Sequence, residues 1–185
     1  MVSLQPPVCD FDKAAIDFRL PDYNGKQWTL EQCKGSKGLL IMFICNHCPY
    51  VKAIIERIVR DTNELKELGI NTVAIMSNDQ SLYEEDSTDN MKLIAEKYQF
   101  SFPYLIDSTQ EVAKAYGAVC TPDFFGYNHE LKLQYRGRLD ESRKETASEN
   151  VRRDLFEAMK QVSETGKGPK DQLASMGCSI KWLEE

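Results

Sequence analysis

The chain has 185 residues and a formal net charge of −6, from 29 acidic residues and 23 lysines and arginines. This length suits one domain with a substantial core. The net acidic charge and the lack of a block of basic residues argue against nucleic acid and an anionic membrane as partners. Six cysteines are too few for a disulfide scaffold of this size and favour thiol chemistry in a reducing compartment. If no leader has been removed, the lack of a basic segment followed by an apolar one at the N-terminus predicts a cytoplasmic protein.

The first half of the chain predicts a β-hairpin and then two buried strands joined by a helix. The hairpin covers Asp17–Leu30, with its turn at Asn24-Gly25-Lys26. Leu39–Ile44 is almost entirely apolar, which is typical of a strand covered on both faces. Apolar residues at helical spacing predict a helix over Tyr50–Leu68, and Ile70–Met76 predicts the second buried strand.

The second half predicts a helix, a third strand, another helix, and then a hairpin with a closing helix. Helix-start signals precede Met91–Tyr98, and Phe102–Asp107 predicts the strand. A short helix is expected over Gln110–Tyr116, and a hairpin over Asp123–Arg136, where apolar and polar residues alternate. The apolar residues of Val151–Val162 lie on one helical face, which predicts the last helix.

Strands that alternate with helices and end in an antiparallel hairpin predict an α/β fold, with a mixed central sheet flanked by helices. We predict a single domain over residues 1–165. Gly166–Lys170 is expected to be a linker to a C-terminal tail, residues 166–185, in which Cys178 packs on or near the domain.

The most informative motif is Cys45-Asn46-His47-Cys48, which separates the strand Leu39–Ile44 from a predicted helix. Two thiols at this spacing indicate dithiol–disulfide exchange. We predict that Cys45 lies at the N-terminal end of the helix, where the helix dipole stabilises a thiolate, and that Cys48 is a buried resolving thiol one turn inside. His47 is predicted to stabilise the Cys45 thiolate further; the alternative is a solvated residue at the helix start.

Together with Thr121-Pro122, this motif resembles the thioredoxin superfamily, from about Asp17 to Tyr135. The resemblance implies a thioredoxin-like fold with Cys45 as nucleophile and Cys48 as resolving cysteine. It also implies that Pro122 is a cis-proline beside them, preceded by Thr121. From the residues alone, an ordinary trans turn proline is the alternative.

The long stretch between Cys48 and Pro122, with the N-terminal hairpin, is similar to the redoxin branch of that superfamily, which includes the AhpC/TSA peroxiredoxins and the TlpA-type oxidoreductases. It implies a redoxin-type insertion of an additional strand and helix. Three further segments resemble a bacterial peroxiredoxin-like group with a CxxC motif: Cys120–Phe125, Tyr135–Arg138 and Gly177–Trp182.

The resemblance opens a second interpretation, a thiol peroxidase with Cys48 as peroxidatic cysteine. In peroxiredoxins a Thr or Ser stands three residues before that cysteine and a Pro seven residues before it, where this chain has Cys45 and Ile41. The Thr that helps to orient peroxide is thus replaced by a thiol. Arg136 or Arg138 is still able to approach the site.

The remaining candidates are two auxiliary thiols and a metal site. We predict that Cys120 and Cys178 form a second disulfide or a relay pair; the alternative is that Cys120 is a small buried apolar residue and Cys178 is incidental. Cys45, His47 and Cys48, joined by Cys120 or Cys178, also make a set acceptable to zinc or copper. Their close spacing is awkward for a tetrahedral site, and we predict no metal.

The sequence therefore predicts a thiol–disulfide oxidoreductase that uses the Cys45/Cys48 couple and needs no cofactor. Its expected partners are a disulfide-containing protein or small molecule and a thiol reductant, with no nucleic acid and no membrane. The alternatives are a peroxiredoxin-like peroxidase and a metal-binding or redox-sensing module.

Overall fold

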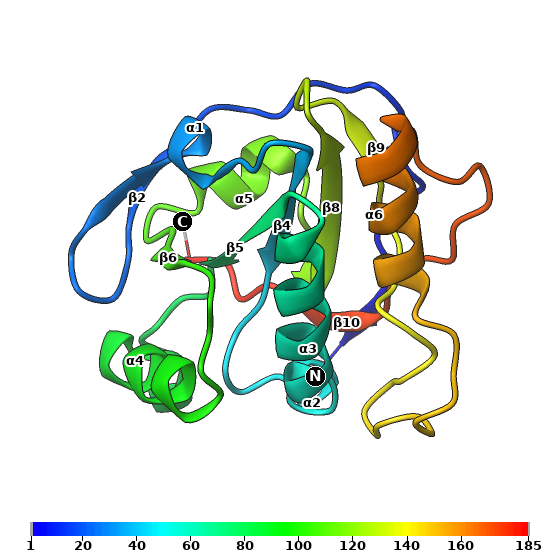
Figure 1. Cartoon of the computed structure of the whole chain (residues 1–185). Coiled ribbons are helices and arrows are strands. Elements are labelled where there is room, and N and C mark those ends of the chain that lie inside the picture. Colours follow the sequence, from blue (N-terminus) through cyan, green and yellow to red (C-terminus); the bar gives the residue numbers. More distant parts are fainter. Residues whose placement is uncertain (1, 185) are drawn as a thin grey trace.

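The computed structural model describes residues 2–184 and has a five-stranded mixed sheet at its centre, in the order β6-β5-β4-β8-β9 (Figure 1). β4 (Gly38–Phe43), β5 (Ile70–Met76) and β6 (Tyr104–Ile106) run parallel to one another. β8 (Asp123–Asn128) and β9 (Leu133–Tyr135) continue the sheet as an antiparallel edge. The predicted α/β class with a mixed central sheet is confirmed.

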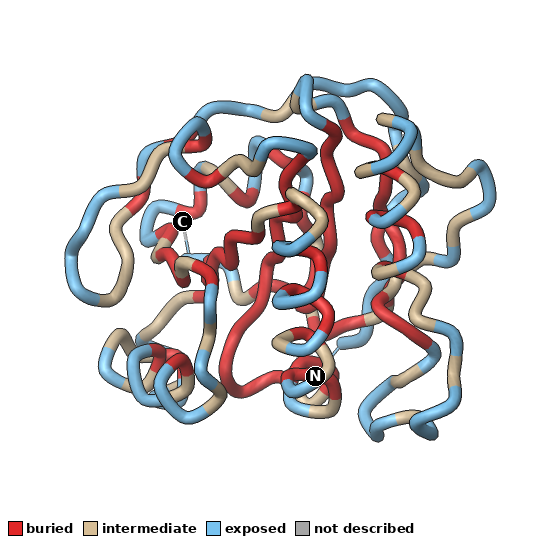
Figure 2. Tube along the Cα trace, in the orientation of Figure 1, coloured by how far each residue is buried: buried red, intermediate tan, exposed pale blue. Residues whose placement is uncertain are grey.

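Helices cover both faces of this sheet. α3 (Ile55–Glu67) and α6 (Asp154–Thr165) pack on one face, together with α4 (Thr88–Lys97). α1 (Leu30–Cys33) and α5 (Glu111–Tyr116) pack on the other. Figure 2 shows that the buried part of the chain lies mainly in the strands between these layers. Within residues 2–184, no helix combines the length and the apolar composition needed to cross a membrane.

β4 is the centre of the core because all six of its residues are buried. Leu40 and Met42 pack with the layer of α3 and α6, whereas Leu39, Ile41 and Phe43 pack with the layer of α5. The alternation follows from the two-residue period of a strand, and burial on both faces explains why the strand is apolar throughout. The core therefore fixes the end of β4, which leads directly into the CxxC motif.

Two small sheets lie beside the central one. β2 (Arg19–Pro21) and β3 (Gln27–Thr29) form the predicted hairpin. β1 (Ser3–Leu4), β10 (Gly177–Ser179) and β7 (Cys120–Thr121) form a three-stranded sheet with β10 in the middle. The tail after the linker thus hydrogen-bonds to the strand that carries Cys120 and Thr121.

The helix predicted over Tyr50–Leu68 is divided in two, α2 (Pro49–Lys52) and α3. Ile54 interrupts the helical ladder, with φ −123° and ψ 2°, and its N–H donates to the carbonyl oxygen of Val51. Another short element that the sequence pattern does not predict is the 3₁₀ helix η1 (Glu84–Asp86) before α4. Both short helices contribute to the candidate site.

Candidate active site

The CxxC motif forms a bend between β4 and α2. α2 begins at Pro49, and Cys48 is its N-cap residue, with extended φ and ψ of −69° and 122°. The α region is disfavoured for a residue before proline, and proline itself is favoured at the first helical position. The prediction that Cys48 lies one turn inside the helix is therefore wrong, because Pro49 fixes the helix start. Cys45 lies three residues before this N-cap.

The two thiols of the motif are buried and differ strongly in acidity. Hydrogen bonding to Cys45, and to a smaller extent to Cys178 and Thr121, outweighs the effect of burial and lowers the pKa of Cys48 to about 5. Burial, the bond to Cys48 and the negative charge of Asp86 raise the pKa of Cys45 well above its usual value. These surroundings favour the thiolate on Cys48, whereas the sequence predicted it on Cys45.

This acidity is measurable. In reduced protein, the ultraviolet absorbance of the thiolate is expected to titrate with a midpoint near the pKa of Cys48, about 5, and to vanish from that range in Cys48→Ser. Cys45→Ser keeps a hydrogen-bond donor beside Cys48 and should keep a low midpoint, whereas Cys45→Ala should raise it. A wild-type midpoint at the ordinary thiol value would contradict the assignment.

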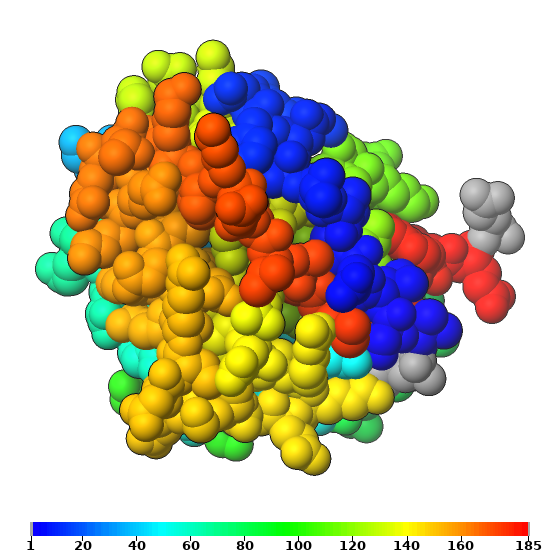
Figure 3. Space-filling model, turned by 90° about the vertical axis from the view of Figure 1, so that its right-hand side faces the viewer, coloured from blue at the N-terminus to red at the C-terminus, as the bar shows by residue number. Residues whose placement is uncertain are grey.

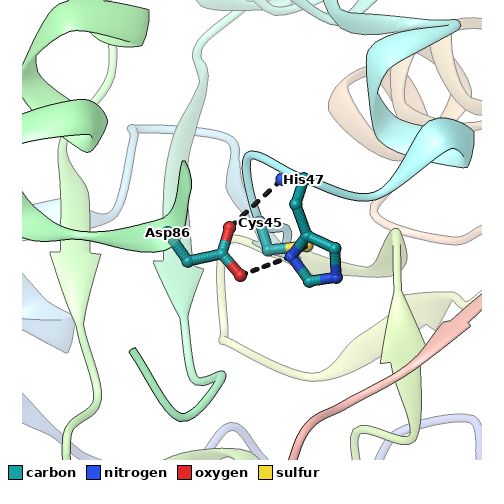
Figure 4. A group of neighbouring side chains, drawn as sticks. All are labelled: Cys45, His47 and Asp86. Atoms are coloured by element: carbon teal, nitrogen blue, oxygen red, sulfur yellow. Dashed lines mark hydrogen bonds and ion pairs between the residues drawn. The ribbon is translucent and has the colours of Figure 1, made fainter. Parts of the chain in front are cut away.

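Asp86, at the end of η1, anchors the CxxC bend. One carboxylate oxygen accepts hydrogen bonds from the backbone N–H groups of Asn46 (2.8 Å) and His47 (3.1 Å). The other lies 2.5 Å from Nδ1 of His47 and accepts from Nδ2 of Asn78 (3.1 Å). Figure 4 shows the carboxylate facing both the backbone and the ring of His47. Burial alone would raise the pKa of Asp86, but these hydrogen bonds outweigh it and lower the pKa.

Sequence analysis missed Asp86, which stands 39 residues after His47 in the chain. It lies in a polar loop whose only pattern is a helix-start signal. No spacing rule connects this loop to the CxxC motif, because they meet only through the fold.

The ring of His47 is held on two sides. Its plane stacks on Tyr83, with centroids 3.8 Å apart and 6° between the planes. Nδ1 is 3.7 Å from the sulfur of Cys45, but only 2.5 Å from the carboxylate of Asp86. The alternative of a solvated His47 is wrong, since only 6% of the residue is exposed. Asp86 and Tyr83 therefore fix the position of the ring.

The Thr121-Pro122 segment lies against both sulfurs. The peptide bond between these residues is cis, as the resemblance implies. Oγ1 of Thr121 is 3.4 Å from Sγ of Cys45, and its carbonyl oxygen is 3.2 Å from Sγ of Cys48. The structure thus brings together all five residues that the sequence predicted for the catalytic site: Cys45, His47, Cys48, Thr121 and Pro122.

The predicted pair of Cys120 and Cys178 does not occur. Cys178 stands opposite Thr121 in the β10–β7 ladder, and Cys120 stands opposite Ser179. Successive side chains of a strand point to opposite faces, so the two cysteines face away from each other. Cys178 instead places its sulfur 2.8 Å from that of Cys48. Cys120 is fully buried with its sulfur near the carbonyl oxygen of Pro122, in keeping with the alternative of a small apolar residue.

Cys45 borders a cavity of about 340 Å³ between the CxxC bend, α3 and α4. Its walls include Ile55, Ile94 and Phe100. Both thiols are buried, with 1% of Cys45 and 0% of Cys48 exposed, but of the two only Cys45 lines the cavity. A substrate in this cavity would therefore meet Cys45 first, although Cys45 is the less acidic thiol.

The donor atoms of Cys45, His47 and Asp86 lie within 4.8 Å of one another, which is compact enough to consider a metal ion. Both oxygens of Asp86 already accept two hydrogen bonds each, and Nδ1 of His47 takes part in one of them. A cation at this position would have to break these bonds. The donor set therefore fits a hydrogen-bonded cluster better than a metal centre. The sequence also offered Cys120 as a further metal ligand, but its side chain lies on the face of β7 opposite to that of Thr121.

The two arginines expected near the site are engaged elsewhere. Arg136 donates to both oxygens of Asp123 (3.4 and 3.0 Å). Arg138 donates to Asp154 (2.7 Å). Each guanidinium therefore has a carboxylate partner away from the CxxC motif.

Comparison with known proteins agrees with this geometry. A family model described as the AhpC/TSA family matches residues 11–138. The thiol-disulfide oxidoreductase ResA of Halalkalibacterium halodurans is 28% identical over 103 residues, which are 56% of this chain and 54% of that protein. The chain thus spans about half the length of this curated relative.

Among solved structures, a conserved protein from Geobacillus kaustophilus is 42% identical with a TM-score of 0.93, covering 100% of this chain and 98% of that one. The thioredoxin domain of a thiol-disulfide oxidoreductase from Bacteroides vulgatus is 18% identical with a TM-score of 0.57, covering 72% of this chain and 89% of that domain. The second likeness concerns the fold alone, and it shows that the fold is thioredoxin-like.

Proposed function

The chain belongs to the AhpC/TSA family, and on this premise we propose that it is a thiol–disulfide oxidoreductase that uses Cys45 and Cys48 on disulfide-containing proteins or small molecules. The observation that carries the proposal is the division of properties between the two thiols. Cys45 borders the cavity, while Cys48 is buried behind it with its pKa lowered to about 5. The curated relative with the name thiol-disulfide oxidoreductase supports the same reaction class.

The geometry gives each thiol a step. Cys45 passes its proton to the Cys48 thiolate, and its own sulfur attacks one sulfur of the substrate disulfide. The substrate S–S bond breaks, and the leaving sulfur takes the electron pair and then the proton from Cys48. Cys48 has given up its proton, and hydrogen bonding to Cys178 and Thr121 still favours its thiolate, which attacks Cys45 in the mixed disulfide. This forms the Cys45–Cys48 disulfide and releases the second substrate thiolate, which takes a proton from solvent.

The cycle closes when an external thiol reduces the Cys45–Cys48 disulfide. We propose that this reductant is a thiol, which reverses the exchange by attack on the disulfide. The direct test is equilibration in glutathione buffers, followed by alkylation and peptide mapping. We expect one reversible disulfide between Cys45 and Cys48, with a potential in the range of roughly −270 to −120 mV that such couples span. Protein in which these two thiols never pair would overturn the proposal.

A thiol peroxidase is the second candidate, favoured by the low pKa of Cys48, which stands at the peroxidatic position of the family pattern. A peroxide would have to reach a fully buried sulfur without a nearby free arginine, since Arg136 and Arg138 are paired with carboxylates. Peroxide consumption that depends on Cys48 but not on Cys45 would favour this candidate over disulfide exchange.

A further inference from the structure

Cys178 is held in place by the tail strand that carries it. β10 hydrogen-bonds to β7 on one side and to β1 on the other, so Cys178 stands between Thr121 and Ser3. Figure 3 shows the tail lying across this face of the molecule beside the N-terminal residues. A Cβ at Gly177 would collide with the carbonyl oxygen of Thr121, which shows how closely the strand approaches. The pairing of β10 with both neighbouring strands therefore fixes where Cys178 lies.

The residues after β10 fix the strand as well. The backbone N–H of Lys181 donates to Oδ1 of Asn78 (2.9 Å), and its carbonyl oxygen accepts from the N–H of Asp79 (2.8 Å). Gln110 donates to the same carbonyl (2.8 Å) and accepts from the N–H of Leu183 (2.8 Å). The side chain of Asn78 also donates to Asp86, so it contacts both the tail and the carboxylate that anchors the CxxC bend.

The sulfur of Cys48 has two thiol neighbours. One is Cys45, the other cysteine of the motif, which acts on the pKa of Cys48. The other is Cys178, whose sulfur lies 2.8 Å from that of Cys48. A disulfide requires about 2.05 Å between sulfurs, so a shift of less than about 1 Å separates Cys48 and Cys178 from bonding. Both residues are buried, with 0% and 1% exposed. Such an arrangement is unexpected for an incidental cysteine.

We propose that Cys178 is a third redox-active thiol, which replaces Cys45 as the disulfide partner of Cys48. The inference rests on the proposed function, because it begins from the Cys45–Cys48 disulfide. The sulfur of Cys178 attacks Cys48, the Cys48–Cys178 bond forms and the Cys45–Cys48 bond breaks. Cys45 leaves with the electron pair and gains the proton that Cys178 loses. The step is redox-neutral, so it needs no further oxidant or reductant.

The surroundings favour this attack in the oxidised protein. In the reduced protein burial, the bond to Cys48 and the negative charge of Cys48 raise the pKa of Cys178 to about 12, while Lys181 and the backbone of Tyr50 lower it. Oxidation of Cys48 removes both of the raising influences that come from Cys48, while burial, Lys181 and the backbone of Tyr50 keep theirs, so the pKa of Cys178 falls. Cys178 therefore becomes a better nucleophile when Cys48 is in a disulfide.

The exchange makes the reduction of the substrate disulfide harder to reverse. A released substrate thiol can re-enter the cavity and attack Cys45 while Cys45 is bonded to Cys48. After the exchange the disulfide joins Cys48 and Cys178, neither of which lines the cavity, and Cys45, which does, is a free thiol. The exchange thus moves the disulfide away from the cavity in which the product thiol lies.

The test maps disulfides by alkylation and mass spectrometry after oxidation of the full chain in glutathione buffer. In Cys45→Ser we expect Cys48–Cys178 as the main disulfide, and in Cys178→Ser we expect Cys45–Cys48 alone. Cys120→Ala, on the opposite face of β7, is the matched control and should show the wild-type pattern. Circular dichroism melting of each variant identifies any that fails to fold, and Cys178→Ala then replaces Cys178→Ser.

The outcomes separate this inference from the proposed function. A folded Cys45→Ser protein in which Cys48 and Cys178 both remain alkylatable overturns the inference alone, provided that the wild type forms Cys45–Cys48. A wild type in which Cys45 and Cys48 never pair overturns the proposed function, and the exchange with it. Wild-type protein that shows both disulfides, in a ratio that shifts wholly to Cys45–Cys48 in Cys178→Ser, supports both.

Discussion

Cys45→Ser is expected to reduce insulin disulfides no faster than the buffer control, because the serine hydroxyl cannot form the mixed disulfide with which the reaction begins. Cys48→Ser should keep the first step and lose the second, so it should accumulate a covalent Cys45–substrate adduct that mass spectrometry detects. The two variants thus fail at different points of one cycle. The turbidity assay with insulin and a dithiol reductant measures the first effect.

The matched control is Cys33→Ala. Cys33 is buried in α1 under the opposite face of the sheet, and burial raises its pKa to about 12, so it has no place in the cycle. We expect this variant to reduce insulin at the wild-type rate. If Cys45→Ser remained active while Cys48→Ser did not, Cys48 would be the attacking thiol, and the assignment of steps would have to be reversed.

The sequence predicted the parts of the fold that depend on local pattern. The apolar run of β4 and the CxxC motif at its end are contiguous in the chain, and their relation follows from strand burial alone. The pairing with Thr121-Pro122 came from the resemblance to a family, since 73 residues separate Cys48 from Thr121. Composition and spacing by themselves leave that proline as an ordinary turn residue.

The acidity of the thiols was predicted wrongly because contacts between distant parts of the chain set their pKa values. The pattern places a thiolate on Cys45 near the start of a helix, but Asp86 comes from 41 positions further along and adds a negative charge beside it. Cys48 gains hydrogen bonds from Cys178, which lies 130 residues away. Neither contact leaves a periodic signal. For the same reason the alternation of side chains in β7 and β10, which separates Cys120 from Cys178, becomes visible only when the register is known.

Asp86→Ala is expected to lower the free energy of unfolding by about 3 kcal/mol at neutral pH, since buried N–H groups of Asn46, His47 and Asn78 lose their acceptor. The pKa of Asp86 is lowered in the folded protein, so its contribution is present above the unfolded pKa and is lost as the pH falls through the folded one. The difference in stability between wild type and variant should therefore shrink in acid. Urea unfolding at neutral and at acidic pH measures both effects.

Asp107→Ala is the control that separates an effect on the stability of the fold from an effect on the pKa of Cys45. Asp107 is as deeply buried as Asp86, and accepts hydrogen bonds from Ser77 (2.9 Å) and from the backbone of Ala113 (2.9 Å), but it is not among the charges that act on the pKa of Cys45. Its loss should destabilise the protein by a similar amount. Only Asp86→Ala should also lower the pKa of Cys45, because it removes the negative charge beside that thiol, and so speed alkylation of Cys45 in reduced protein. Equal alkylation rates in the two variants would show that Asp86 supports the CxxC bend without tuning its acidity.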